Sequence, residues 1–308
     1  MFEYKSISEL VNAASSAGKT ISEVVLADQA EQLCISPDAL FERMDARLSV
    51  MEDSVKAGMN PALRSTSGLT GGDASRMWDH AASGGICGGF TNRAIARALA
   101  VSENNAAMGK IVAAPTAGSC GILPGAVVSM LDEGRCSREA AVMALFTAGA
   151  FGMVIAQNAS IAGAEGGCQA ECGSAAAMAA GAVVEMLGGT PAQAFDAAAI
   201  AMQNIMGLVC DPVAGLVEMP CAKRNASGVA NALVSADLAL SGIFSEIPFD
   251  EVVEAMYKVG KALPSTLRET ALGGVATTPT ALAMKEKIYG KGAAESACSG
   301  DCASCGLC

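Results

Sequence analysis

The sequence is poor in charged and aromatic residues. Only 17% of its 308 residues are charged and 4% are aromatic, whereas 52% are hydrophobic and 34 are glycines. An all-β sandwich or barrel depends on aromatic and β-branched side chains, so this composition disfavours one. Small residues instead allow helices to pack closely. We therefore predict an all-α fold, a compact Ala- and Gly-rich multi-helix domain.

Clusters of basic residues and a secretory signal are also missing. The net charge is −11, which argues against binding to nucleic acid or to anionic membranes. The N-terminus has neither a basic region nor a long apolar run. The most apolar stretch, residues 140–156, is at the short end of the membrane-spanning range, and we interpret it as a buried core helix. We expect a cytoplasmic protein.

Helix signals cover much of the chain. Capping signatures that begin at Ser6 and Thr20, together with a Ser36-Pro37 pair, predict about three helices in residues 1–55. Further helices are expected downstream, at 92–107, 137–156, 173–189, 190–207, 225–240 and 250–263. We interpret residues 1–290 as one helical domain.

Cysteine is abundant, with 12 residues. Without a secretory signal, such a number favours metal or redox chemistry over a disulfide framework. One closely spaced set, typical of a zinc or iron–sulfur site, lies in a polar C-terminal tail, residues 291–308, that we expect to be flexible. This tail set comprises Cys298, Cys302, Cys305 and Cys308.

A second set comprises Cys168, Cys210 and Cys221. Each lies in a Gly- or Pro-containing loop between apolar helices, where a purely structural cysteine would not need a turn. Three protein ligands on a four-iron cluster would leave one iron open to act as a Lewis acid. The other cysteines are interpreted as buried small residues: Cys34, Cys87, Cys120, Cys136 and Cys172.

Two polar, Gly-rich turns offer donors for an anion. The first contains Ser65, Ser67, Gly68 and Thr70. It is either an anion-binding loop or a plain connector within the polar segment 59–90. The second turn is rich in backbone donors and contributes Thr116 and Ser119.

His80 is the only histidine. It is a candidate general base, although a lone histidine beside Trp78 is more often structural.

Several segments together resemble the iron–sulfur-dependent L-serine dehydratase (L-serine ammonia-lyase) family. They are NASIAGAEGGCQAECG, MGLVCDPVAGLVEMPCAKRNA, SENNAAMGKIVAAPTAGSCGILPG and MYKVGKALPSTLRETALGGVA. The SGLTGGDA loop is similar to that of the alpha chain of the two-chain form. The resemblance covers about residues 60–280.

This resemblance implies an all-helical chain that carries a [4Fe–4S] cluster on Cys168, Cys210 and Cys221. The implied reaction is the deamination of L-serine to pyruvate and ammonia without pyridoxal phosphate. A separate beta chain would complete the enzyme and supply the general base, in preference to His80. The family also suggests that the terminal Cys308 visits the open iron.

The substrate residues are interpreted from the same resemblance. The turns at 65–72 and 116–121 are candidates for holding the carboxylate of L-serine. Asn158, Ser160 and Glu165 are candidates for positioning its amine or hydroxyl. Alternatives are desulfidation of cysteine or deamination of threonine on the same cluster, or a non-enzymatic iron–sulfur redox or sensor protein.

Overall fold

The computed structural model describes residues 4–290, and the predicted all-α fold is confirmed over them. This part of the chain contains no strand, and its one isolated β-bridge joins Cys210 to Arg268. The α-helices of the described residues are α1 (Ile7–Ala17), α2 (Ile21–Leu33), α3 (Pro37–Gly58), α4 (Asp73–Ala82), α5 (Gly88–Ala106), α6 (Ile122–Asp132), α7 (Arg138–Asn158), α8 (Gly163–Gly166), α9 (Ser174–Met186), α10 (Pro191–Gln203), α11 (Cys221–Leu240), α12 (Phe249–Ala262) and α13 (Pro279–Tyr289). Short π or 3₁₀ turns are η1 (Gln169–Gly173), η2 (Val213–Gly215), η3 (Ser265–Leu267) and η4 (Gly274–Thr277). The predicted cysteine-rich tail, with Cys298, Cys302, Cys305 and Cys308, lies outside the described residues.

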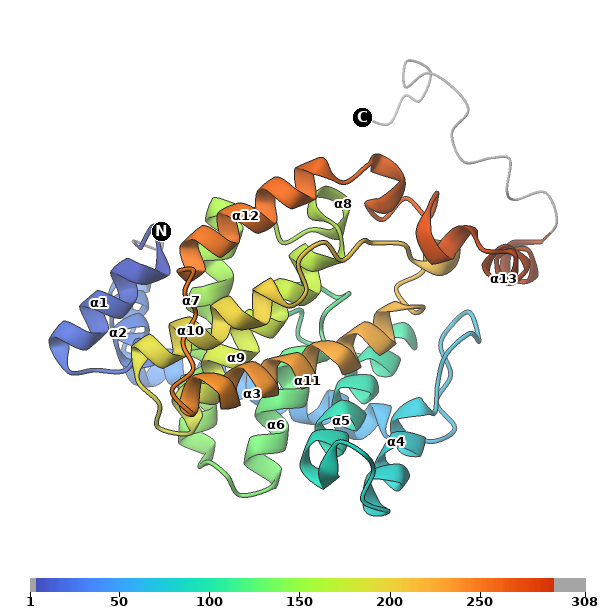
Figure 1. The fold of residues 1–308 in the computed structure, drawn as a ribbon. Helices are drawn as coiled ribbons and strands as arrows, with labels where there is room; N and C mark the ends of the chain where they lie inside the picture. Colours follow the sequence, from blue (N-terminus) through green and yellow to red (C-terminus); the bar gives the residue numbers. More distant parts are fainter. Residues whose placement is uncertain (1–3, 291–308) are drawn as a thin grey trace.

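The core is built from helices that pack through small side chains. Helix α9 lies among α7, α10 and α11 (Figure 1) and is buried along nearly its whole length. A Cβ atom on Gly181 of α9 would lie 3.0 Å from the ring of Phe151 in α7. Likewise, a Cβ on Gly152 of α7 would lie 3.0 Å from Met178 of α9. The abundant Gly and Ala therefore set how closely the helices approach.

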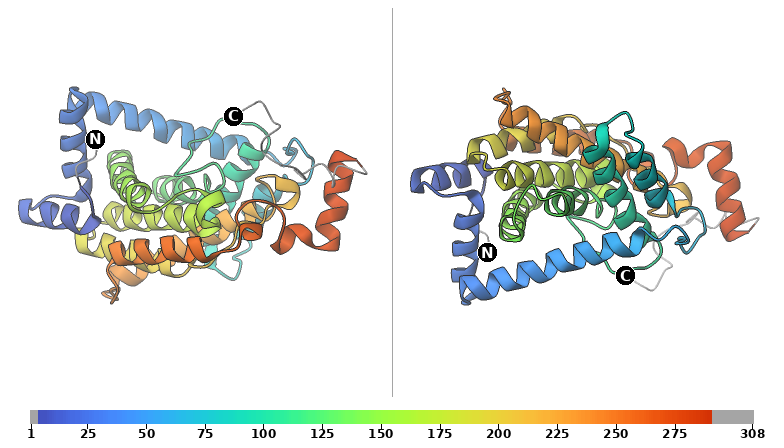
Figure 2. Two further views of the ribbon diagram at one scale, coloured as in Figure 1. Left: turned by 90° about the horizontal axis from the view of Figure 1, so that it is seen from above. Right: turned by 90° about the horizontal axis from the view of Figure 1, so that it is seen from below.

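The predicted N-terminal helices are confirmed, with their caps. The Ser6 hydroxyl accepts from the Glu9 N–H, Thr20 forms a capping box with Glu23, and Ser36 caps a helix that begins with Pro37. Helices α1 and α2 lie at one end of the molecule and α13 at the opposite end, and α3 runs along one side (Figure 2). These four helices frame the core.

Helix α7 includes the apolar stretch predicted as a core helix. Among the described residues, α7 is the one helix whose length and composition would allow it to cross a membrane. Most of its apolar side chains, however, are buried against the rest of the fold, among them Phe146, Phe151 and Ile155. The prediction of a core helix is confirmed.

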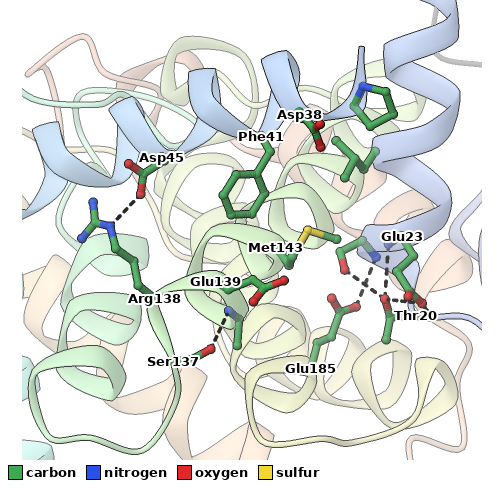
Figure 3. Close-up of a pocket in the computed structure, with 14 residues that line it drawn as sticks. Thr20, Glu23, Asp38, Phe41, Asp45, Ser137, Arg138, Glu139, Met143 and Glu185 are labelled. Carbon is green, nitrogen blue, oxygen red and sulfur yellow. Dashed lines mark hydrogen bonds and ion pairs between the residues drawn. The ribbon is translucent and has the colours of Figure 1, made fainter.

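A cavity of about 920 Å³ lies between the N-terminal helices and the core (Figure 3). Phe41 of α3 and Met143 of α7 face each other across it. At its edge the Arg138 guanidinium donates to Asp45 at 2.7 Å. The Glu185 carboxylate accepts from the Thr147 hydroxyl at 2.7 Å. These two groups are satisfied by neighbours, and none of the cysteines within residues 4–290 borders the cavity.

The segment 59–90, predicted as a long polar loop, contains helix α4. The prediction of a loop is wrong there because the helix is started by a distant residue. The carboxylate of Glu103, in α5, accepts from the N–H groups of Gly72 at 3.0 Å and Asp73 at 2.8 Å. Local sequence carries no sign of such a cap.

Candidate functional site

Cys168 lies between the short helix α8 and the π turn η1. The preceding Gly167 has φ +76°, and a Cβ there would lie 2.6 Å from Leu263 and 2.9 Å from the carbonyl oxygen of Leu208. Only glycine fits this turn. The side-chain amide of the buried Gln169 then donates to the carbonyls of Gly166 and Met256, each at 3.0 Å. These contacts fix the backbone on both sides of Cys168.

Cys210 is held by an extended backbone contact. Its N–H donates to the Leu267 carbonyl at 2.9 Å, and its carbonyl accepts from the Glu269 N–H at 2.8 Å. Glu269 has φ +64°, which is uncommon for a residue with a side chain. The strained segment 267–269 therefore lies against Cys210, and such strain is concentrated at functional sites.

Cys221 is the first residue of α11, directly after Pro220. Helix N-termini favour a negative charge such as a thiolate. The buried Asn225, one turn later, donates to the carbonyls of Cys221 at 2.9 Å and Gly118 at 2.7 Å. It also accepts from the Gly121 N–H at 2.8 Å. Asn225 thereby joins Cys221 to the turn at 116–121.

The three predicted ligand cysteines come together although they are far apart in the sequence. Their side chains are buried, with 3%, 3% and 9% of Cys168, Cys210 and Cys221 exposed. Burial raises the pKa of Cys221 to about 12 and also raises the pKa of Cys210. The negative charge of Cys168 adds to both shifts, so the three sulfurs lie within electrostatic reach of one another.

Cys168 differs from its two partners. A hydrogen bond from the Cys172 thiol lowers the pKa of Cys168, and the positive charge of Arg224 lowers it further. The two sulfurs are 3.4 Å apart. Arg224 is held in place by the buried carboxylate of Asp211 at 2.7 Å. Cys168 is therefore the thiol best prepared to act as a thiolate ligand.

The second predicted turn lies next to these cysteines. The Thr116 hydroxyl is 3.2 Å from that of Ser119 and donates at 2.7 Å to the carboxylate of Glu171. Among the hydrogen bonds of residues 4–290, none begins at the backbone N–H of Ala117, Gly118 or Ser119. Backbone N–H groups without a partner in the protein are available to donate to an anion.

Glu171 is a site residue that the sequence analysis missed. It lies in η1 with 9% of its surface exposed. Burial raises the pKa of its carboxyl group, and the Thr116 hydroxyl partly opposes that shift. A signal was present, because Glu171 is an acidic residue between Cys168 and Cys172 in a segment of small residues.

The first predicted turn is occupied by a second missed carboxylate, that of Glu218. The hydroxyls of Ser67 and Thr70 donate to it at 2.9 and 3.0 Å. The Ser65 hydroxyl accepts from the Thr70 N–H at 3.2 Å, and the Gly68 N–H donates to the Ser65 carbonyl. The donors of this turn are thus largely used within the protein.

The other predicted substrate residues are exposed or are hydrogen-bonded to backbone groups. Asn158 is exposed and donates to the carbonyl of Lys5 at 2.7 Å. Ser160 accepts from the Ala162 N–H at 3.1 Å. Glu165 is exposed. His80 is exposed on α4, and no described interaction joins it to any of the three cysteines.

Among residues 4–290, no three His, Cys, Asp or Glu side chains are close enough together to hold a single metal ion. The predicted visitor to the open iron, Cys308, lies outside the described residues.

The sequence was compared with models of protein families. Residues 16–276 match the family described as "Serine dehydratase alpha chain". The chain belongs to the serine dehydratase alpha chain family. This family membership was predicted from the segments around the same three cysteines and is confirmed.

Curated relatives agree with this assignment. The chain is 49% identical over 288 residues to "Probable L-serine dehydratase, alpha chain" of Bacillus subtilis (strain 168), covering 93% of this chain and 96% of that protein. It is 45% identical over 285 residues to "L-serine dehydratase, alpha chain" of Peptoniphilus asaccharolyticus, covering 92% and 98%. With "L-serine dehydratase TdcG" of Escherichia coli (strain K12) it shares 47% identity over 182 residues, 58% of this chain but only 40% of that protein.

Proposed function

We propose that this chain is the alpha chain of an L-serine dehydratase. It deaminates L-serine to pyruvate and ammonia with a [4Fe–4S] cluster on Cys168, Cys210 and Cys221, and without pyridoxal phosphate. The observation that carries the proposal is the convergence of these three buried thiols in a member of the serine dehydratase alpha chain family.

The donor chemistry fits an iron–sulfur cluster. Thiolates are the usual ligands of such clusters, and metal binding deprotonates them even where burial raises their pKa. The positive charge of Arg224 lies beside Cys168, and Asp211 neutralises it. Iron would supply the positive charge that three thiolates require. When bound, the cluster supplies a Lewis-acidic iron, which eases departure of the substrate hydroxyl.

The protein's own groups would bind and orient the substrate. The free N–H groups of Ala117, Gly118 and Ser119, with the Thr116 hydroxyl beside them, suit the carboxylate of L-serine. They would also stabilise the negative charge that develops on it when the Cα proton is removed. The turn at 65–70 is the weaker candidate, because Glu218 already accepts from Ser67 and Thr70.

A partner chain is part of the proposal. The match to the Escherichia coli relative leaves 60% of that longer protein unmatched, and the relatives of similar length are named alpha chains. A separate beta chain would complete the enzyme and provide the base for the Cα proton, since His80 is exposed and unconnected to the described site. We propose that the complex works in the cytoplasm.

Anaerobic reconstitution tests this function. The chain is loaded with iron and sulfide, with and without its candidate beta chain, and pyruvate is measured after L-serine is added. We expect pyruvate only when the cluster is present, and more with the beta chain. Pyruvate formation under neither condition would refute the proposal. Parallel assays with L-threonine and L-cysteine decide between serine dehydratase and the two related activities.

A further inference from the structure

Glu171 has an unusual environment for a buried carboxylate. Its Oε1 atom accepts from the Thr116 hydroxyl at 2.7 Å. None of the hydrogen bonds and ion pairs of residues 4–290 ends on its Oε2 atom. A buried carboxylate normally has several donors or a paired cation, because leaving it unpaired is costly. Glu171 therefore has one carboxylate oxygen that no donor of the described residues satisfies.

Two glycines make space for this carboxylate. A Cβ on Gly118 would lie 2.8 Å from Oε1 of Glu171. A Cβ on Gly163 would lie 2.8 Å from Oε2 and 3.1 Å from the sulfur of Cys210. The carboxylate thus lies between two close backbone segments and beside a proposed cluster ligand.

The charges around Glu171 also favour binding of a cation. The carboxylate of Glu171 lies near the negative charge of Glu269 and near the sulfur of Cys210. The cation that acts on Glu171 is Arg224, but Arg224 is already bound to Asp211 at 2.7 Å. The region next to Glu171 is consequently rich in negative charge.

The neighbouring turn has the opposite character. The N–H groups of Ala117, Gly118 and Ser119 have no acceptor among the described residues and suit an anion. Gly118 belongs to both the turn and the surroundings of Glu171. Its N–H has no acceptor among the described residues, and its backbone packs against Oε1 of Glu171. An anion receptor and a carboxylate side by side match a small zwitterion, in which the ammonium and carboxylate groups are on one carbon.

We propose that Glu171 binds the α-ammonium group of the amino-acid substrate while the 117–119 turn binds its carboxylate. This inference rests on the proposed function and adds the residue that binds the α-ammonium group of the substrate. Glu171 is a substrate-binding residue in this account. The charge-assisted hydrogen bond to the ammonium group supplies the preference.

The test compares two unreactive ligands that differ only at the α-position. L-Alanine carries an ammonium group and L-lactate a hydroxyl group, and both lack the 3-hydroxyl that the reaction expels. Their affinities for the reconstituted holoenzyme are measured by calorimetry. We expect Glu171→Gln to lower the affinity for L-alanine about ten-fold to a hundred-fold and to change the affinity for L-lactate by less than about two-fold.

Controls separate binding from folding and from cluster loading. Gln has the shape of Glu and still accepts from Thr116, and unchanged L-lactate binding shows that the variant is folded. Iron content is measured because Glu171 lies near Cys210. Glu246→Gln removes an equal charge from an exposed loop and should leave both affinities as they are.

The outcomes distinguish this inference from the proposed function. The inference would be overturned if Glu171→Gln lost affinity equally for both ligands, or lost none for L-alanine. Pyruvate formation by the wild type would still support the proposed function in that case. Failure of the wild-type enzyme to prefer L-alanine, or a larger effect from Glu269→Gln, would also overturn it. If the wild type shows the expected preference but forms no pyruvate from L-serine, the receptor stands and the proposed function fails.

Discussion

Glu103 and Glu171 are both buried carboxylates whose pKa is raised by burial, but their surroundings differ. Glu103 accepts from three backbone N–H groups at the start of α4, those of Gly72, Asp73 and Ala74. Glu171 accepts from a single hydroxyl, that of Thr116. The carboxylate oxygens of Glu103 are both hydrogen-bonded within the protein, whereas one oxygen of Glu171 is left for a ligand.

The number of hydrogen-bond donors distinguishes a buried carboxylate that can bind a ligand from one that stabilises the fold. Exposure does not separate the two residues well, because 2% of Glu103 and 9% of Glu171 is exposed. The number of donors does, since each donor compensates for part of the desolvation cost. Glu218 is intermediate, with two hydroxyl donors from Ser67 and Thr70.

The largest effect on substrate binding is expected at Gly163. In Gly163→Ala the new methyl group would lie 2.8 Å from Oε2 of Glu171 and 3.1 Å from the Cys210 sulfur. Displacing the carboxylate should raise KM for L-serine by about ten-fold or more, and overpacking should cost about 1–3 kcal/mol of unfolding free energy. Steady-state kinetics and urea unfolding measure both. An unchanged KM would mean that Glu171 does not contact the substrate.

Glu103→Ala should affect stability instead. It leaves the N–H groups at the start of α4 without an acceptor, so we expect a loss of about 2–4 kcal/mol in unfolding free energy. Faster amide hydrogen exchange in residues 73–82 should accompany this loss. The exposed Glu246→Ala is the control and should stay within about 0.5 kcal/mol. A loss as small as that of the control would remove the contrast with Glu171.

Ser67→Ala should have an intermediate effect. It removes one of the two hydroxyl donors of the buried Glu218 and should lower the unfolding free energy by about 1 kcal/mol. Thr66→Val is the control, because its hydroxyl is exposed and makes only a long bond of 3.4 Å. A ten-fold rise in KM for L-serine with no loss of stability would assign this turn to the substrate and not to the fold.

The smallest effect is expected from Gly149→Ala in α7. A Cβ there meets nothing within 4 Å, and alanine is favoured over glycine within a helix. We expect a gain of about 0.5–1 kcal/mol in unfolding free energy, measured in urea, with kinetics unchanged. A loss of activity would show that glycine-to-alanine changes in this fold act without local contact, and would weaken the interpretation of Gly163→Ala.

Most of the fold was predictable from local signals. Caps at Ser6, Thr20 and Ser36, and a Thr190-Pro191 start, gave helices close to those observed. Helix α4 was not predicted because its cap comes from Glu103, far along the sequence. Helix α13 was also missed, although Thr278-Pro279 is a recognisable start.

The candidate site was predictable only in part. The loops of Cys168, Cys210 and Cys221 are recognisable by their Gly and Pro residues and by family resemblance. The roles of Glu171 and Glu218 depend on contacts with Thr116 and with the 65–70 turn. No pattern in the sequence fixes such long-range pairs, because tertiary packing decides them.

Iron and acid-labile sulfide analysis of cysteine variants tests the central claim most directly. The reconstituted wild type should hold about four irons per chain with the visible absorbance of a cluster. Cys168→Ser, Cys210→Ser and Cys221→Ser should each lose most of the iron, whereas Cys136→Ser, whose thiol lies 3.8 Å from the Met186 sulfur, should keep it. A Cys168→Ser protein with full iron content and unchanged absorbance would contradict the account.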